Sequence, residues 1–70
     1  MRVYMVFITW DCHAEVWCAL SEEIPLALEH GSFDELIERV KLAAPGILKL
    51  NEMEPAGMFH FAAEKRVGVI

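Results

Sequence analysis

Residues 31–50 read GSFDELIERVKLAAPGILKL, and this stretch decides the fold because it carries a clear helical pattern. Ser32 is placed to accept a hydrogen bond from the third helical amide, with Glu35 reaching back to the Ser32 amide. Asp34 and Glu35 suit the positive end of the helix dipole. The apolar residues that keep helical spacing are Phe33, Leu36, Ile37, Val40, Ala44 and Ile47. We therefore predict a helix that begins at Phe33.

Pro45 and Gly46 interrupt this helical pattern. A proline inside a helix clashes with the carbonyl four residues earlier, here that of Lys41, and a glycine adds about 1 kcal/mol of propensity cost. We expect the helix to kink or to restart at Pro45. A second helical piece would then cover residues 45–50 and end at Asn51.

Strand patterns precede the helix. Residues 3–10, VYMVFITW, are rich in β-branched and aromatic residues and equally apolar at even and odd positions, which predicts a central strand that is covered on both faces. A hairpin loop over residues 11–14 leads to a second strand over residues 15–20. Pro25 then marks a turn or bulge, and residues 26–30 form a short third strand at the sheet edge.

After the helix, residues 52–57 are predicted to be a linker, and residues 58–63 return to strand character. The order strand, strand, strand, helix, strand predicts an α+β fold in one domain over residues 1–70. We expect a three-stranded antiparallel sheet with one Pro-kinked helix on one face, and a fourth strand that returns parallel beside the first, in the spatial order 3-2-1-4. The open sheet face or a sheet edge is then the expected subunit contact.

The composition favours an acidic oligomer. The chain has 70 residues, of which 56% are hydrophobic, and a chain this short has little core in which to bury them. The formal net charge of −5 argues against direct binding to nucleic acid, which relies on clusters of Lys and Arg. No apolar run reaches the roughly 20 residues that a membrane span needs, and no export signal stands out, so we expect a cytoplasmic protein with Cys12 and Cys18 as free thiols.

The order of several short motifs resembles the HicB-like antitoxin family. Asp11 and residues 15–17 (EVW) precede the turn at residues 21–26 (SEEIPL) and the helix start at residues 31–36 (GSFDEL). The resemblance covers roughly residues 3–51. The tail resembles a stand-alone, functionally uncharacterised branch of that family; the residues that carry this second resemblance are Pro45, Leu48, Leu50, Asn51 and the run FHFAAEKR over residues 59–66.

The resemblance implies a partly degenerate RNase H-like fold that forms dimers or tetramers. In toxin–antitoxin systems of this kind, the chain covers a small basic RNA-cleaving toxin. Leu26 departs from the pattern, because the family usually has a glycine after the proline of the turn. No helix-turn-helix or ribbon-helix-helix segment is recognisable before Ile70, so we expect no separate DNA-binding domain.

Two sets of residues are candidates for binding. Glu22, Glu23 and Glu29 form the most acidic local surface and could meet a basic partner, although a solvated loop explains them equally well. Trp10 and Trp17 are expected to face each other across the first hairpin, as part of the core or of a subunit contact. The candidate oligomer interface comprises Trp10, Trp17, Phe59 and Phe61.

The sequence gives little support for a catalytic site or a metal site. An RNase H-type site needs several carboxylates on two metal ions, and Asp11 is the one candidate near the first strand. Cys12 and His13 could join His30 or His60 around zinc, but adjacent residues in a tight turn are poorly placed to wrap one ion. We expect no catalytic residue, metal or cofactor, and therefore no enzyme.

These observations lead to one functional hypothesis and one alternative. The hypothesis is a non-enzymatic, homo-oligomeric protein-binding domain that masks a small basic toxin in the manner of an antitoxin. The alternative is a structural homodimer, or a module that binds a small ligand, without any toxin. The residues leave open whether the last strand is exchanged between subunits.

Overall fold

The structure, a computed structural model, describes residues 2–69. Its elements follow one another as β1 (Arg2–Asp11), β2 (Val16–Leu20), β3 (Ala27–His30), α1 (Phe33–Leu50) and β4 (Ala56–Glu64). The four strands form one sheet in the order β3-β2-β1-β4. β1 pairs antiparallel with β2 and parallel with β4, and β2 pairs antiparallel with β3. The predicted α+β fold and strand order are therefore confirmed.

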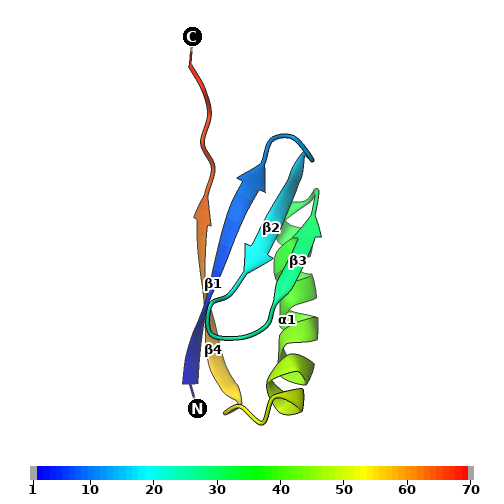
Figure 1. The fold of residues 1–70 in the computed structure, drawn as a ribbon, viewed down its shortest axis with the longest axis vertical. Helices are drawn as coiled ribbons and strands as arrows, with labels where there is room; N and C mark the ends of the chain where they lie inside the picture. The colour runs from blue at the N-terminus through cyan, green and yellow to red at the C-terminus, as the bar shows by residue number, and fades with distance from the viewer. Residues whose placement is uncertain (1, 70) are drawn as a thin grey trace.

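The single helix packs on one face of the sheet, behind β2 and β3 in Figure 1. Side chains alternate between the faces of a strand, and on β1 the side chains at even positions meet the helix. Four helical side chains spaced one turn apart complete this layer. The buried core consists of Tyr4, Val6, Ile8, Ala19, Ile24, Leu26, Leu36, Val40, Ala44 and Leu48.

The first turn of α1 is capped largely as its sequence predicts. Ser32 is the N-cap, and its Oγ accepts a hydrogen bond from the Glu35 amide at 3.3 Å. The return bond differs from the prediction, because the Ser32 amide donates to Nδ1 of His30 at 2.9 Å. Glu35 instead forms an ion pair with Arg39, one turn further along the exposed side of the helix, with 3.8 Å between Glu35 Oε1 and Arg39 Nε.

Pro45 lies inside one helix and does not begin a second helical piece. Both Pro45 and Lys41, whose carbonyl loses its helical partner, are on the exposed side of α1. That carbonyl can therefore bond to water, which lowers the cost of the missing amide. The continuous helix from Phe33 to Leu50 carries several charges, and among residues 2–69 no helix is long and apolar enough to cross a membrane.

The strand limits shift slightly from those predicted, for local reasons. β2 begins at Val16 because Glu15 has a left-handed backbone with φ of 55°, which a strand cannot include. β4 begins at Ala56, inside the predicted linker, because Ala56 pairs with Arg2. The next pair joins Val3 to Met58, so Gly57 is the extra residue of a β-bulge.

The expectation that the first strand is covered on both faces is wrong for the single chain. Val3 and Phe7 point away from the helix and keep 53% and 43% of their surface exposed. One helix can cover only one face of the sheet. The other face of the sheet is therefore open to solvent in one copy of the chain.

Candidate protein-binding surface

The sheet face opposite α1 carries large apolar side chains that nothing in the described part of the chain covers. Phe7 of β1 is the centre of this surface, because it pairs with Leu20 on one side and Ala62 on the other. Val3 and Met58 form a neighbouring pair. The exposed fractions are 53% for Val3, 43% for Phe7, 52% for Leu20 and 63% for Met58. We call this surface, formed by Val3, Phe7, Leu20, Ala62 and Met58, the outer sheet face.

Acidic groups border one end of the outer sheet face. Cys18 of β2 pairs with Thr9 on one side and with Glu29 of β3 on the other. Burial raises the pKa of the Cys18 thiol, and the nearby negative charges of Glu29 and Asp11 raise it further. Among residues 2–69, the ion pairs include neither Glu29 nor Asp11. The Glu29 carboxylate is thus available to a positively charged partner, and the charge of Asp11 adds to the negative potential at this end.

The structure separates the three glutamates that the sequence grouped as a candidate binding surface. Glu29 lies on the outer-face side of β3, and Glu22 is exposed in the preceding loop. Glu23 is committed within the chain: its carboxylate accepts from the Met5 amide and from Arg2 Nη2, both at 2.9 Å. Glu22 and Glu29 remain candidates for contact with a partner, whereas the contacts of Glu23 are structural.

The loop after β2 completes the edge of β1 with side chains, a role that sequence patterns did not reveal. β2 ends at Leu20, opposite Phe7, so the next part of β1 has no strand beside it on that side. The Ser21 hydroxyl donates to the Met5 carbonyl at 2.8 Å, while Glu23 accepts from the Met5 amide. Ser21 Oγ also accepts from the amides of Glu23 and Ile24. A serine two residues before a glutamate at a strand end is the only signal, and it is too common to be diagnostic.

The two tryptophans form an aromatic cluster on the helix side of the sheet. Trp10 and Trp17 are register partners, as predicted, and their ring centroids lie 5.1 Å apart in an edge-on arrangement. Trp17 also contacts Phe33 of α1, with centroids 5.0 Å apart. Lys65 places its Nζ 4.5 Å from the Trp10 ring centroid, a distance typical of a cation–π contact. Both indoles are half-buried by contacts within the chain.

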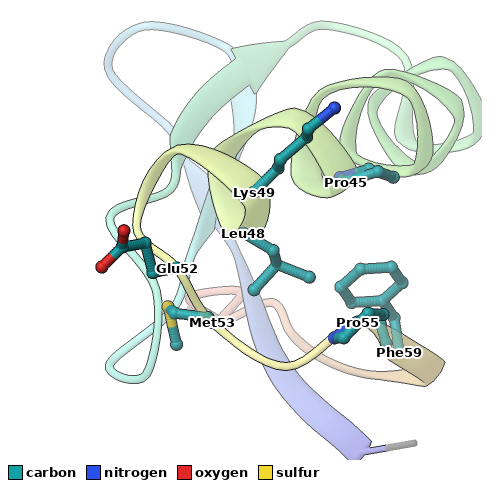
Figure 2. A pocket seen from close by; sticks show the side chains of 8 residues that line it. Pro45, Leu48, Lys49, Glu52, Met53, Pro55 and Phe59 are labelled. Atoms are coloured by element: carbon teal, nitrogen blue, oxygen red, sulfur yellow. The ribbon is translucent and has the colours of Figure 1, made fainter.

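Phe59 and Phe61 also face the helix side, at the part of the sheet that α1 leaves incompletely covered. Phe59 lies 6.3 Å from Tyr4 and 6.4 Å from Phe61, measured between ring centroids. Beside Phe59, a groove of about 550 Å³ separates the end of α1 from the start of β4. Figure 2 shows Leu48, Pro55 and Phe59 as its apolar walls, with the Glu52 carboxylate directed away from it.

The residues considered for catalysis or metal binding do not converge. Asp11 Oδ1 accepts from the amides of His13 and Ala14, so this carboxylate closes the hairpin turn. Cys12 is exposed at the same turn, whereas Nδ1 of His30 accepts from the Ser32 amide and His60 pairs with Met5 in the sheet. Among residues 2–69, no three His, Cys, Asp or Glu side chains form a group suited to a metal ion.

Comparison with known proteins identifies relatives of unassigned function. A family model described as "Domain of unknown function (DUF1902)" matches residues 3–69. A crystal structure of a hypothetical protein from the extremely thermophilic bacterium Thermus thermophilus is similar over 99% of both chains, with a TM-score of 0.76 and 27% identity. No curated protein matches the chain. The outer sheet face and its acidic end are therefore the features from which a function can be argued.

Proposed function

The chain belongs to the DUF1902 family, and from this premise we propose that it is a non-enzymatic, oligomeric protein-binding domain that masks a small basic RNA-cleaving toxin in the manner of an antitoxin. The similarity of its motif order to the HicB-like antitoxins suggests the class of partner. The outer sheet face supplies the surface. No step of this function requires a catalytic group or a cofactor.

The observation that carries the proposal is the uncovered apolar outer sheet face. Monomeric proteins rarely expose contiguous apolar patches of large side chains, and such patches usually mark contacts with other proteins. Here Phe7, Leu20 and Met58 are all more than two fifths exposed although each belongs to a strand of the sheet. A partner that covers this face removes apolar surface from water, which favours association.

The negative charge of the chain favours a partner of positive charge. The chain carries a net charge of −5, and Glu22, Glu29 and Asp11 form no ion pair with the basic residues among positions 2–69. A basic partner would be attracted over long range and aligned at the acidic end of the outer sheet face. We expect association to weaken as ionic strength rises, because salt screens exposed charges.

If the gene beside that of this chain encodes a small basic protein, co-expression of the two tests the proposal, and the lack of such a gene would count against it. We expect the chain to co-purify with that protein and to relieve its toxicity. Phe7→Glu places a charge in the centre of the outer sheet face and should abolish both effects. Leu42→Glu is the matched control, because Leu42 is 82% exposed on α1, away from the outer sheet face.

The outcomes separate binding from folding. Circular dichroism must first show that the Phe7→Glu chain is folded, and Leu20→Glu takes its place if it is not. Equal rescue by the outer-face variant and by Leu42→Glu would show that the outer sheet face is not the binding surface. The antitoxin function itself would be wrong if the unmodified chain neither bound its neighbour nor relieved toxicity.

The apolar groove favours a second candidate function, the binding of a small ligand. Its volume of about 550 Å³ lies within the range of small-molecule sites, and Leu48, Met53 and Phe59 supply apolar walls. The dye 1-anilinonaphthalene-8-sulfonate is a suitable probe. Met53→Trp should fill the groove and reduce dye fluorescence, whereas Leu42→Trp should not; equal dye binding by both variants would argue against a site in the groove.

A further inference from the structure

The free edge of β4 is the main open hydrogen-bonding surface of the sheet. β4 lies at the end of the strand order and pairs with β1 alone, so one side of its backbone has no partner strand among residues 2–69. It is nine residues long, whereas β3 at the opposite edge has four residues. Open strand edges pair readily with other strands unless prolines, charges or bulges prevent it.

β4 has few of these protective features. From Met58 to Ala63 the strand contains no proline and no residue of fixed charge. Its bulge, at Gly57, lies at the very start of the strand. The charged residues Glu64, Lys65 and Arg66 come only at its end. Neither a proline nor a fixed charge in the middle of the strand therefore opposes pairing with another strand.

Residues 65–69 extend beyond the sheet as a continuation of β4, at the upper end of Figure 1. Val67 is 71% exposed and Val69 is 93% exposed. This tail lies at one end of a molecule that is 47 Å long, whereas the apolar groove lies beside the start of β4 at the other end. The two valines thus remain largely uncovered by the described part of their own chain.

We propose that two copies of the chain pair their β4 strands antiparallel across a two-fold axis near Ala62 and Ala63, so that the tail of each copy runs along the start of β4 and the groove of the other. This proposal deepens the oligomeric part of the proposed function. The pairing is isologous, because the same segment of each copy forms the contact. It leaves β4 without an unpaired edge. Two four-stranded sheets become one continuous sheet across the dimer.

The register of this pairing suits the side chains. Two residues that lie directly opposite each other in neighbouring strands point to the same face of the sheet. When the pairing is centred on Ala63, each odd-numbered residue lies opposite an odd-numbered residue of the other copy, and each even-numbered residue opposite an even-numbered one. Val67 then lies opposite the partner copy's Phe59, on the side where the groove opens. Glu64 lies opposite the partner copy's Ala62, which avoids two facing carboxylates.

The same symmetry preserves the proposed binding surface. A two-fold axis perpendicular to the sheet places both outer sheet faces on one side of the dimer. Phe7 lies on β1, one strand in from the paired edge, so β4 pairing leaves its side chain uncovered. The dimer therefore presents two adjoining outer sheet faces to a basic partner.

Light scattering coupled to size exclusion gives the first test. We expect the full chain to have twice the 8.0 kDa mass of one chain. Val67→Asp together with Val69→Asp should shift the mass to that of a monomer. Leu42→Asp, which adds one charge at an exposed helix position, should leave the dimer intact.

Symmetric cross-linking gives the second test. In a chain with Cys12→Ser and Cys18→Ser, we expect Ala63→Cys to form a disulfide-linked dimer under mild oxidation, whereas Leu42→Cys should not. Ala62→Cys is the second position, in case the axis lies one residue earlier. A linked dimer that dissociates to monomers on reduction would support the proposal.

The remaining outcomes overturn the proposal in distinguishable ways. A monomeric full chain would remove both the oligomeric part of the proposed function and the β4 dimer, and would leave toxin binding to be judged by co-expression. A dimer that neither cysteine links, and that Phe7→Glu dissociates, would place the subunit contact on the outer sheet face. The β4 pairing would then be wrong while oligomerisation stood.

Discussion

At the scale of single residues, adjacent glutamates have different roles. Glu22 is exposed and forms none of the ion pairs among residues 2–69, whereas the Glu23 carboxylate bonds to Arg2 and to the backbone of Met5. Burial of a backbone amide without a partner costs free energy, so the second of these bonds matters most. Of these two adjacent residues of the same type, Glu23 therefore has a structural role, whereas Glu22 remains a candidate for contact with a partner.

Alanine substitution of each glutamate tests this difference. Glu23→Ala should lower the free energy of unfolding by about 1–3 kcal/mol, because the part-buried Met5 amide loses its acceptor. Glu22→Ala, the matched control, should change it by less than about 0.5 kcal/mol. Urea denaturation measures both, and equal effects would contradict the structural role of Glu23.

The thiols should also differ in reactivity. Burial, followed by the charges of Glu29 and Asp11, raises the pKa of Cys18 from its ordinary value of 9.0. Alkylation by iodoacetamide near pH 8, followed by mass spectrometry, should therefore modify exposed Cys12 faster than Cys18. The folded chain disfavours the Cys18 thiolate. The contribution of the protonated Cys18 thiol to the free energy of unfolding should therefore be present below pH 9.0 and be lost as pH rises through the raised pKa.

Charge removal provides the control for the thiol prediction. Glu29→Gln removes a negative charge near Cys18, so it should lower the pKa of this thiol and speed its alkylation. Glu22→Gln removes a charge that does not contribute to the Cys18 shift and should leave the rate unchanged. A Cys18 rate that does not respond to Glu29→Gln would show that the Glu29 charge does not slow the reaction, which leaves burial and the Asp11 charge as its causes.

At the scale of elements, α1 contains two residues that weaken helices, and it remains continuous through both. Pro45 and Gly46 lie on the exposed side of the helix, while Ala44 and Leu48 on either side of them are buried. The buried neighbours hold this turn against the core. Tertiary packing thus overrides a local preference to end the helix.

Replacement of Gly46 by alanine should stabilise this element. A Cβ at Gly46 would meet no atom within 4 Å, so the helix gains propensity without a clash. We expect the free energy of unfolding to rise by about 1 kcal/mol. Gly68→Ala is the control, because its Cβ also meets open space but the residue lies outside any helix. Thermal and urea denaturation should show a gain for Gly46→Ala alone.

At the scale of the whole molecule, one hydrogen bond joins two distant segments of the fold. The Tyr4 hydroxyl on β1 donates to the carbonyl of Glu54, in the segment between α1 and β4, at 2.6 Å. The ring of Tyr4 is fully buried beneath the helix layer. This contact connects positions 50 residues apart and so fixes where the chain turns back into the sheet.

Tyr4→Phe removes this bond and keeps the ring. We expect the free energy of unfolding to fall by about 1 kcal/mol, because the Glu54 carbonyl loses a part-buried donor. Urea denaturation measures the change, and circular dichroism should show an unaltered fold. A variant as stable as the original chain would show that water replaces the hydroxyl at no cost.

The order of the elements could be predicted because each signal is local, and the order of the strands in the sheet followed from it by the usual right-handed return of the last strand. The β-branched run of the first strand and the Ser32 cap act within a few residues, and both are found as expected. The turn at residues 21–26 was predicted, but the bonds from its Ser21 and Glu23 side chains to Met5 were not, because they reach across 16 and 18 residues. Its sequence resembles any polar loop.

Among the candidate binding residues, too, some features could be predicted from the sequence and others could not. The pairing of Trp10 with Trp17 follows from a short hairpin, so its geometry could be foreseen. The outer sheet face could be expected only in general terms, because which residues remain uncovered depends on where the helix packs. Phe7 and Val6 are equally apolar neighbours, and their different exposure arises from the side of the sheet that α1 occupies.

The amino-acid sequence by itself determined the order of the elements, the capped start of the helix and the acidic, apolar character of the chain, because these depend on residue type and near neighbours. Only the tertiary structure decided that Glu23 is a structural residue, that Pro45 lies within one helix, and that β4 has a free edge with an exposed tail. These features arise from contacts between segments distant in the chain. Their energies depend on geometry that a linear pattern does not contain.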